Sequence, residues 1–205
     1  MDLDMKPLDQ EGLLPNPLEQ FHCWYDEACR LESIQLPSAC CMSTVGLDGL
    51  PDGRMMLLKE CDDRGFVVYT NIESVKGRSL AKKARAALTF YWEDLRRQIR
   101  IQGEVEQVSA GEASAYFKSR PRESQIGAWA SKQSDVLEDR AVLDRRFEDL
   151  LKKYEGKEVP RPPYWTGFRV IPAKIEFWQE RPNRLHDRFV YTKEKEGWKI
   201  VRLYP

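Results

Sequence analysis

Residues 40–71 read CCMSTVGLDGLPDGRMMLLKECDDRGFVVYTN. This stretch contains three runs rich in β-branched, aromatic and long apolar side chains, over 40–45, 54–59 and 66–71. Turn signals separate the runs: LDG at 47–49, PDG at 51–53 and DDRG at 62–65. Such residues between short apolar runs mark the ends of strands. The pattern predicts antiparallel strands joined by short connections, as in a meander that curls into a barrel.

The same pattern continues on both sides of this stretch. Further strands are expected over 86–92, 98–108, 168–171 continuing to 174–179, 187–192 and 198–203. Helical spacing and capping signals predict helices over 17–31, 74–83, 109–119, 121–129 and 139–154. The late strands need the earlier ones as partners, so we expect a single domain over 16–205, preceded by a flexible arm over 1–15. The predicted class is α+β: an antiparallel barrel of seven or eight strands with peripheral helices.

Composition limits the possible functions. The 205 residues are 41% hydrophobic, which is enough for a core, and 33 basic residues balance 33 acidic ones. A protein that binds the nucleic-acid backbone normally carries a basic excess, so we expect no nucleic-acid partner. No apolar run is long enough for a membrane helix, and the acidic start does not resemble a signal peptide. Five cysteines without a CxxC pair indicate buried, reduced thiols in a cytoplasmic protein.

The common ligand-binding motifs are absent. The chain has no GxGxxG and no GxxxxGK[ST] phosphate loop. It has two histidines, His22 and His186, which excludes a histidine-rich metal site. We therefore expect no bound metal.

Cationic side chains alternate over RLHDR at 184–188. In an extended chain Arg184, His186 and Arg188 would share one face. This arrangement has two interpretations: a solvated edge strand with ion pairs, or a site for a phosphate or carboxylate. Basic residues next to expected helix starts, at 76–78 and 120–122, have the same two interpretations, because helix N-termini favour anions.

Three stretches together resemble the pyridoxine/pyridoxamine 5'-phosphate oxidases. They are IEFWQ at 175–179 followed by RLHDR at 184–188; SRPRESQIGAW at 119–129 with KQS at 132–134; and RMMLLK at 54–59 with YTN at 69–71. The resemblance runs from about residue 17 to the end. It implies an FMN-binding split barrel and a homodimer with FMN in the subunit interface. It also implies oxidation of pyridoxine or pyridoxamine 5'-phosphate to pyridoxal 5'-phosphate by O₂, with release of H₂O₂.

The resemblance also implies roles for individual residues. Those expected to contact FMN are Arg54, Met55, Met56, Leu57, Leu58, Lys59, Tyr69, Thr70, Lys76, Gln98, Gln133, Ser134, Trp178 and Arg188. Those expected to contact the substrate are Lys59, Tyr116, Arg120, Ser124, Arg184, Leu185 and His186. Within this set, Arg184 and His186 are the candidate catalytic residues, expected to orient the substrate ring over the flavin.

The chain departs from the family pattern at Val75, where a basic residue is usual, and at Leu36, where some members have Asp. Two other functions stay open. One is a related flavin oxidase of the kind that acts in phenazine biosynthesis, against which the intact stretch 119–134 argues. The other is a non-catalytic split-barrel protein that binds FMN or haem, against which Arg184 and His186 argue.

Overall fold

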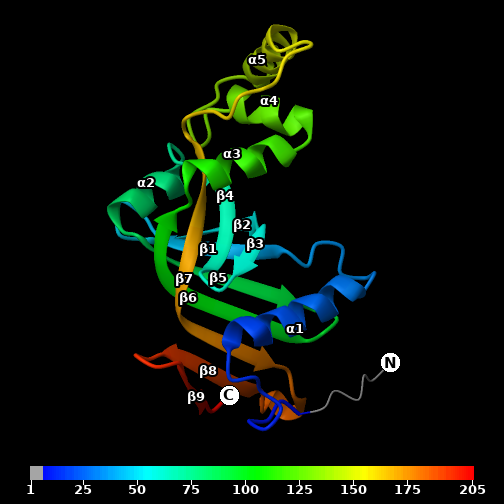
Figure 1. Ribbon diagram of the computed structural model, residues 1–205, viewed down its shortest axis with the longest axis vertical. Helices are drawn as coiled ribbons and strands as arrows, with labels where there is room; N and C mark the ends of the chain where they lie inside the picture. The colour runs from blue at the N-terminus through cyan, green and yellow to red at the C-terminus, as the bar shows by residue number, and fades with distance from the viewer. Residues whose placement is uncertain (1–6) are drawn as a thin grey trace.

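A computed structural model of the chain describes residues 7–205 (Figure 1). Its elements are α1 (Pro17–Arg30), β1 (Ala39–Val45), β2 (Pro51–Leu57), β3 (Glu60–Asp62), β4 (Gly65–Asn71), α2 (Val75–Lys82), β5 (Arg85–Trp92), β6 (Arg97–Gln107), α3 (Ala110–Ser119), α4 (Arg122–Ala130), α5 (Arg140–Lys153), β7 (Trp165–Gln179), a 3-10 turn (Pro182–Arg184), β8 (Asp187–Lys193) and β9 (Trp198–Arg202).

All nine strands of the described residues belong to one antiparallel sheet. Seven follow the order β2-β1-β5-β6-β7-β4-β3, and the other two lie off this path, with β8 paired to β7 and β9 paired to β8. Strand β7 is shared between two parts of the sheet, because its first half pairs with β4 and its second half pairs with β8. The register between β6 and β7 shifts at Gln102/Gly103, which face Lys174 and Pro172, so the extra residue of this irregularity, Ala173, lies in β7 between its two halves. A Cβ on Gly103 would lie 1.9 Å from the Ile171 carbonyl oxygen, so a larger residue cannot fit at this position. The curled sheet confirms the predicted barrel architecture.

Helix α1 covers the inner face of the sheet. The Asn16 side chain accepts a hydrogen bond from the Leu18 amide, and Pro17 occupies the first turn, as the sequence predicts. The buried face of α1 includes Phe21 and Trp24, which pack on core residues of β4, β5 and β7. Burial of these aromatic side chains fixes α1 against the sheet.

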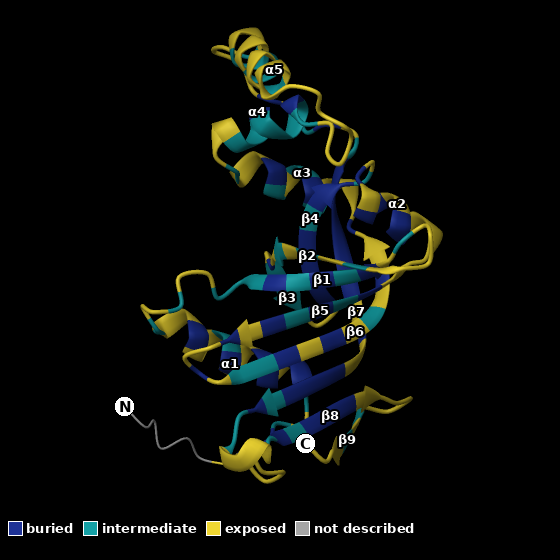
Figure 2. Cartoon of the chain, turned by 180° about the vertical axis from the view of Figure 1, so that it is seen from behind, coloured by how far each residue is buried: buried dark blue, intermediate teal, exposed yellow. Residues whose placement is uncertain are grey.

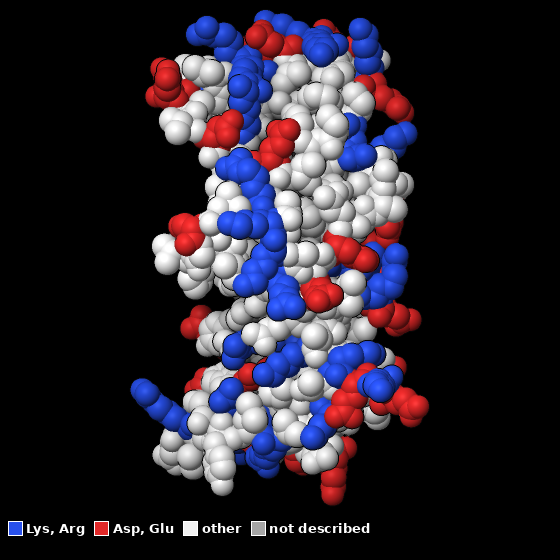
Figure 3. Space-filling model, turned by 90° about the vertical axis from the view of Figure 1, so that its left-hand side faces the viewer, with Lys and Arg blue, Asp and Glu red and all other residues white. Residues whose placement is uncertain are grey.

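The other helices gather at one end of the molecule, and β8 and β9 lie at the opposite end (Figure 1). Ser109 and Glu112 form the predicted capping box at the start of α3. Helix α5, at the extremity, has no buried residue, which agrees with its largely exposed colouring in Figure 2. Side chains of both charge signs are interspersed along the face shown in Figure 3, with Lys and Arg forming a band along its length.

Some details differ from the sequence predictions. The expected turn at 51–53 belongs to β2, because the connection from β1 is closed earlier, by the Gly46 amide bonding to the Leu50 carbonyl at 2.7 Å. The three-residue strand β3 was not predicted. Of the five cysteines expected to be buried, only Cys40 is buried, and Cys23 and Cys29 are exposed.

The expected flexible arm is described only in part, since residues 1–6 lie outside the described residues. From residue 7 onward it makes contacts with the rest of the chain. Leu8 and Leu13 are buried in the core, and the Tyr191 hydroxyl donates to the Leu14 carbonyl at 2.8 Å. Among residues 7–205, no helix is both long enough and apolar enough to cross a membrane.

Candidate functional site

A cavity of about 840 Å³ opens between β2, β4 and the helices α2, α3 and α4. This volume is in the range of small-molecule sites. It brings together most of the residues for which the sequence predicts cofactor or substrate contacts: Arg54, Met55, Met56, Leu57, Lys59, Tyr69, Thr70, Lys76, Tyr116, Arg120, Ser124 and Gln133.

Lys76 is a buried cation at one side of this cavity, with 8% of its surface exposed. It follows the N-cap Ser74 of α2, and its ammonium donates to Thr70 Oγ1 at 3.1 Å and to Gln133 Oε1 at 2.9 Å. These acceptors are neutral, and among residues 7–205 the ammonium forms no ion pair. Burial and the nearby charge of Arg54 lower the pKa of Lys76. An anionic group would compensate this buried charge.

Arg120 is a second, half-buried cation in the same cavity, at the C-terminal cap of α3. Its guanidinium lies 4.9 Å from the Trp165 ring centre, a cation–π distance. Its Nη1 atom is buried and has no hydrogen-bond partner. Burial lowers the pKa of Arg120. A buried donor without an acceptor is costly, so this atom indicates a place for a ligand oxygen.

An aromatic stack forms the wall beside Arg120. The Tyr69 ring lies 4.1 Å from that of Tyr116 and 5.2 Å from that of Trp165, with nearly parallel planes. The Tyr69 hydroxyl donates to Glu60 Oε1 at 2.8 Å. Burial and this contact with Glu60 raise the pKa of Tyr69, so its phenol stays protonated.

Two of the remaining predicted contacts lie near the cavity without lining it. Leu58 is buried in the core next to β2. Ser134 follows Gln133 directly but is exposed, with a φ of 75°.

The other predicted contacts lie elsewhere in the chain. Gln98, Trp178 and Arg188 form a row across β6, β7 and β8, since Gln98 pairs with Trp178 and Trp178 with Arg188. Arg188 is held by Glu176, whose Oε1 accepts from Arg188 Nε at 2.8 Å. Figure 1 places β8 at the opposite end of the molecule from α2 and α4. One chain therefore carries two separate groups of predicted contacts.

The strand predicted over 187–192 is confirmed as β8, but the extended conformation considered for the residues before it, 184–186, is wrong. Pro182 opens a 3-10 turn, and Asn183 and Arg184 have φ values of 60° and 61°, so the strand begins only at Asp187. Arg184 and His186 therefore project from a loop and not from one strand face. The His186 ring lies 4.6 Å from the Trp178 ring, and its Nδ1 accepts a hydrogen bond from the Arg181 amide at 3.2 Å.

Comparison with known proteins identifies the family. Residues 26–154 match the family profile described as pyridoxamine 5'-phosphate oxidase, and residues 165–205 match the one described as the pyridoxine 5'-phosphate oxidase C-terminal dimerisation region. The chain belongs to the pyridoxine/pyridoxamine 5'-phosphate oxidase family. It is 54% identical to the oxidase of Gloeothece citriformis, over 93% of this chain and 89% of the relative. It is 51% identical to the oxidase of Nostoc punctiforme, over 100% of this chain and 95% of the relative.

Solved structures agree with this assignment. PhzG from Burkholderia lata 383, solved in complex with tetrahydrophenazine-1-carboxylic acid, is 30% identical, with a TM-score of 0.91 and 98% of each chain covered. An FMN-binding protein of Nostoc punctiforme, related to pyridoxamine 5'-phosphate oxidase, shares the fold with a TM-score of 0.73 at 14% identity, over 95% of this chain and 99% of that protein. The protein is thus an oxidoreductase of an oxidase family with a split-barrel fold, and the family relation supports a flavin cofactor.

The described residues fit such a phosphorylated cofactor. Lys76 is a buried cation whose hydrogen-bond acceptors are neutral, and Arg54, bonded to the Met42 carbonyl at 2.9 Å and ion-paired with Asp52, lies nearby. Sequence reasoning did not assign several other cavity residues to the site: Ala39, Asn71, Gly127, Ala128, Ser131 and Trp165. Asn71, Gly127 and Ala128 lie inside the stretches that carry the resemblance, so their place in those stretches could have assigned them to the site.

Proposed function

We propose that this enzyme uses FMN to oxidise pyridoxine 5'-phosphate and pyridoxamine 5'-phosphate to pyridoxal 5'-phosphate, in the synthesis and salvage of vitamin B6. Each turnover removes two electrons and two protons from the substrate and converts O₂ to H₂O₂. The amine substrate also consumes one water molecule and releases ammonia.

One observation carries the proposal: a single cavity contains two cations, the buried Lys76 and the half-buried Arg120, and neither forms an ion pair with a carboxylate among residues 7–205. Lys76 bonds only to neutral oxygens, and the buried Nη1 of Arg120 has no partner at all. Two phosphorylated ligands, a cofactor and a substrate, would satisfy both cations.

If one cation binds the cofactor and the other binds the substrate, the roles of the neighbouring residues follow. Lys76 and Arg54 would hold the cofactor phosphate, and Arg120, Tyr116, Ser124 and Lys59 would bind the substrate phosphate. The flavin, when bound, supplies the two-electron acceptor. The protein then contributes binding and orientation of the substrate ring.

A homodimer would complete the site. None of the second group of predicted contacts lines the cavity, and β8, which carries Arg188, lies at the opposite end of the molecule. This group comprises Gln98, Trp178, Arg184, His186 and Arg188. A two-fold symmetric dimer would bring this group from each subunit to the cavity of the other, which gives two equivalent sites in the dimer. The match of residues 165–205 to a dimerisation region supports this arrangement.

Within this site we assign an orienting role to His186. Its Nδ1 accepts the Arg181 amide hydrogen, so in the neutral ring the hydrogen is on Nε2, which then acts as a donor. The Arg184 guanidinium carries N–H donors and no acceptor.

The test is release of H₂O₂ by the purified, flavin-containing protein. Pyridoxine 5'-phosphate should support turnover, whereas unphosphorylated pyridoxine should be a poor substrate because it leaves Arg120 unpaired. Absence of turnover with both phosphorylated substrates would contradict the proposal. Oxidation of a reduced phenazine carboxylate in their place would favour a PhzG-like function, which the structural similarity to PhzG keeps as the second candidate.

A further inference from the structure

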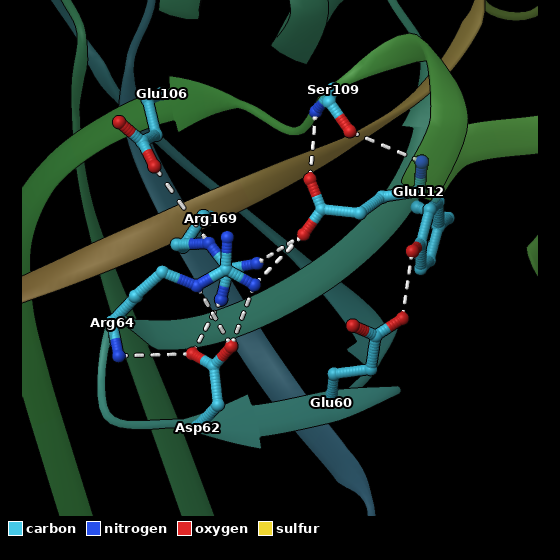
Figure 4. A network of polar contacts seen from close by, with 8 residues as sticks. Glu60, Asp62, Arg64, Glu106, Ser109, Glu112 and Arg169 are labelled. Carbon is cyan, nitrogen blue, oxygen red and sulfur yellow. Dashed lines mark hydrogen bonds and ion pairs between the residues drawn. The ribbon is translucent and has the colours of Figure 1, made fainter.

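A cluster of charged residues outside the cavity centres on Arg169 of β7 (Figure 4). Its side chain is 1% exposed, and its guanidinium pairs with three carboxylates from three different elements. Nη1 lies 2.6 Å from Asp62 of β3, Nη2 lies 2.9 Å from Glu112 of α3, and Nε lies 3.7 Å from Glu106 of β6.

A second arginine contacts two of the same carboxylates from the solvent side. Arg64 lies 2.8 Å from Asp62 and 2.9 Å from Glu112, but its side chain is 59% exposed. Exposed ion pairs contribute little, whereas a buried arginine cannot exchange its partners for water. Arg169 is therefore the buried partner of Asp62 and Glu112, whereas Arg64 contacts them at the surface.

Glu112 connects this cluster to the cavity through α3. Glu112 and Tyr116 are four residues apart and lie on one side of α3, about 6 Å apart along its axis. Arg120 follows as the C-terminal cap of the same helix. Ala113 and Phe117 of α3 are buried, and Tyr116 stacks on Tyr69, so apolar contacts hold one side of the helix. The pair between Glu112 and Arg169 adds a charged contact at the first turn of the helix.

Strand β3 provides a second connection. It carries Asp62, which pairs with Arg169, and Glu60, which accepts the Tyr69 hydroxyl. Tyr69 in turn stacks on Tyr116. Both series of contacts, through α3 and through β3, lead to the stack of Tyr69, Tyr116 and Trp165 that lies beside the Arg120 guanidinium.

We infer that Arg169 is a positioning residue for the phosphate-binding side of the cavity. By holding Glu112 and Asp62, it sets the place of α3 and hence the place of the Arg120 guanidinium. The inference rests on the proposed function for its substrate, but the place of an anion site can be measured without catalysis.

The experiment compares Arg169→Gln with the matched control Arg64→Ala, which removes the other arginine from the same two carboxylates. For each purified, flavin-containing protein, binding of inorganic phosphate is measured by calorimetry, and kcat and KM are measured with pyridoxine 5'-phosphate. We expect Arg169→Gln to weaken phosphate binding and raise KM by about tenfold or more, with kcat changed by less than about threefold. Arg64→Ala should resemble the wild type in all three quantities.

A variant pair tests whether the effect passes through Arg120. Adding Arg169→Gln to Arg120→Ala should cause no further loss of phosphate affinity, because the group that Arg169 positions is gone. If Arg169→Gln does not fold, Glu112→Gln takes its place. It retains an oxygen for the Ser109 amide but loses the charge that pairs with Arg169, and it should raise KM about threefold or more.

The results separate this inference from the proposed function. A folded Arg169→Gln or Glu112→Gln variant with wild-type phosphate affinity and KM would overturn the positioning role. Additive losses in the Arg120→Ala background, or a wild type that does not bind phosphate, would overturn it as well. A wild type that binds phosphate in an Arg169-dependent way but produces no H₂O₂ would support the positioning role and contradict the proposed oxidase activity.

Discussion

Tyr69 and Gly167 lie opposite each other on β4 and β7, and the missing side chain of Gly167 leaves room for the Tyr69 ring. A Cβ at position 167 would lie 2.7 Å from Tyr69 Cε1 and 2.8 Å from Val108 Cγ2. The ring cannot move away freely, because its hydroxyl is bonded to Glu60 and its face is stacked on Tyr116. The conformation of the stack thus depends on a glycine in the middle of a strand.

We therefore predict that Gly167→Ala destabilises the protein by about 1–3 kcal/mol, the usual cost of overpacking a core. Urea unfolding measures this value. Gly127→Ala is the control, because its added Cβ meets nothing within 4 Å and a helical glycine replaced by alanine gains stability. The double variant Gly167→Ala/Tyr69→Leu should lose less unfolding free energy than the sum of the losses of the two single variants. Fully additive losses would show that the Tyr69 ring is not what the added Cβ collides with.

Arg120 illustrates a conflict between stability and binding. Its buried, unpartnered Nη1 costs the ligand-free protein about 1–3 kcal/mol. We predict that Arg120→Met, which keeps an unbranched chain over Trp165, leaves the melting temperature of the ligand-free protein equal or higher. The same change should abolish the stabilisation that inorganic phosphate gives to the wild type. A clearly lower melting temperature without phosphate would mean that the guanidinium stabilises the fold by itself.

The sequence was informative where local chemistry decides the structure. The Ser109–Glu112 capping box and the Asn16–Pro17 helix start were predicted and are confirmed, because each depends on neighbours three or fewer residues apart. Strand β3 was missed, since three residues, Glu60–Asp62, are too few to show a period. The turn at 51–53 was placed wrongly because Pro51 is tolerated at the start of an edge strand, where no partner needs its missing N–H.

The family resemblance named residues that the structure brings into one cavity, but the sequence did not show how they are arranged. Residues as distant as Arg54 and Gln133 meet in one cavity, which only the family resemblance had indicated. The alternation of charge at 184–188 pointed to a strand, but the backbone there turns with positive φ at Asn183 and Arg184. Period-two patterns cannot reveal such a turn, because it depends on the backbone conformation of single residues.

The charged cluster gives a pH dependence of stability with a definite sign. Hydrogen bonds from Ser109, and then the contact with Arg64, lower the pKa of Glu112 from its ordinary 4.5 to about 2. Burial alone would raise the pKa of Asp62. The hydrogen bonds from Arg64 and the charge of Arg169 outweigh this effect, so the pKa of Asp62 is lowered as well. A carboxyl whose pKa is lower in the folded state stabilises the protein above its unfolded pKa, and this stabilisation is lost as the pH falls through the folded value.

We therefore predict that Glu112→Gln unfolds at lower urea concentration than the wild type at pH 6, and that the difference shrinks as the pH falls from 4.5 towards 2. Unfolding midpoints across a pH series measure this effect. Glu155→Gln, at an exposed position after α5, is the control and should show no such convergence. A difference that stays constant down to the acid limit would show that the charge of Glu112 is not the source of the stabilisation.

The separation of the two groups of predicted contacts leads to a test of shared active sites. Arg120 lines the cavity near α3, and Arg184 lies in the loop before β8, at the other end of the molecule. In the proposed dimer each site combines the cavity of one subunit with the loop of the other. Homodimers of Arg120→Ala or of Arg184→Ala should then both be nearly inactive, since every site lacks one arginine.

A heterodimer of one Arg120→Ala subunit and one Arg184→Ala subunit is predicted to regain about half of the wild-type activity, because two-fold symmetry places both changes in one site and leaves the other intact. Two different affinity tags allow its purification after co-expression, and H₂O₂ release measures its turnover. If each subunit instead formed its site alone, both sites of the heterodimer would carry one change and it would be as inactive as the homodimers. Flavin content, measured by absorbance, serves as the control, because neither arginine is assigned to the cofactor and all three dimers should bind it equally.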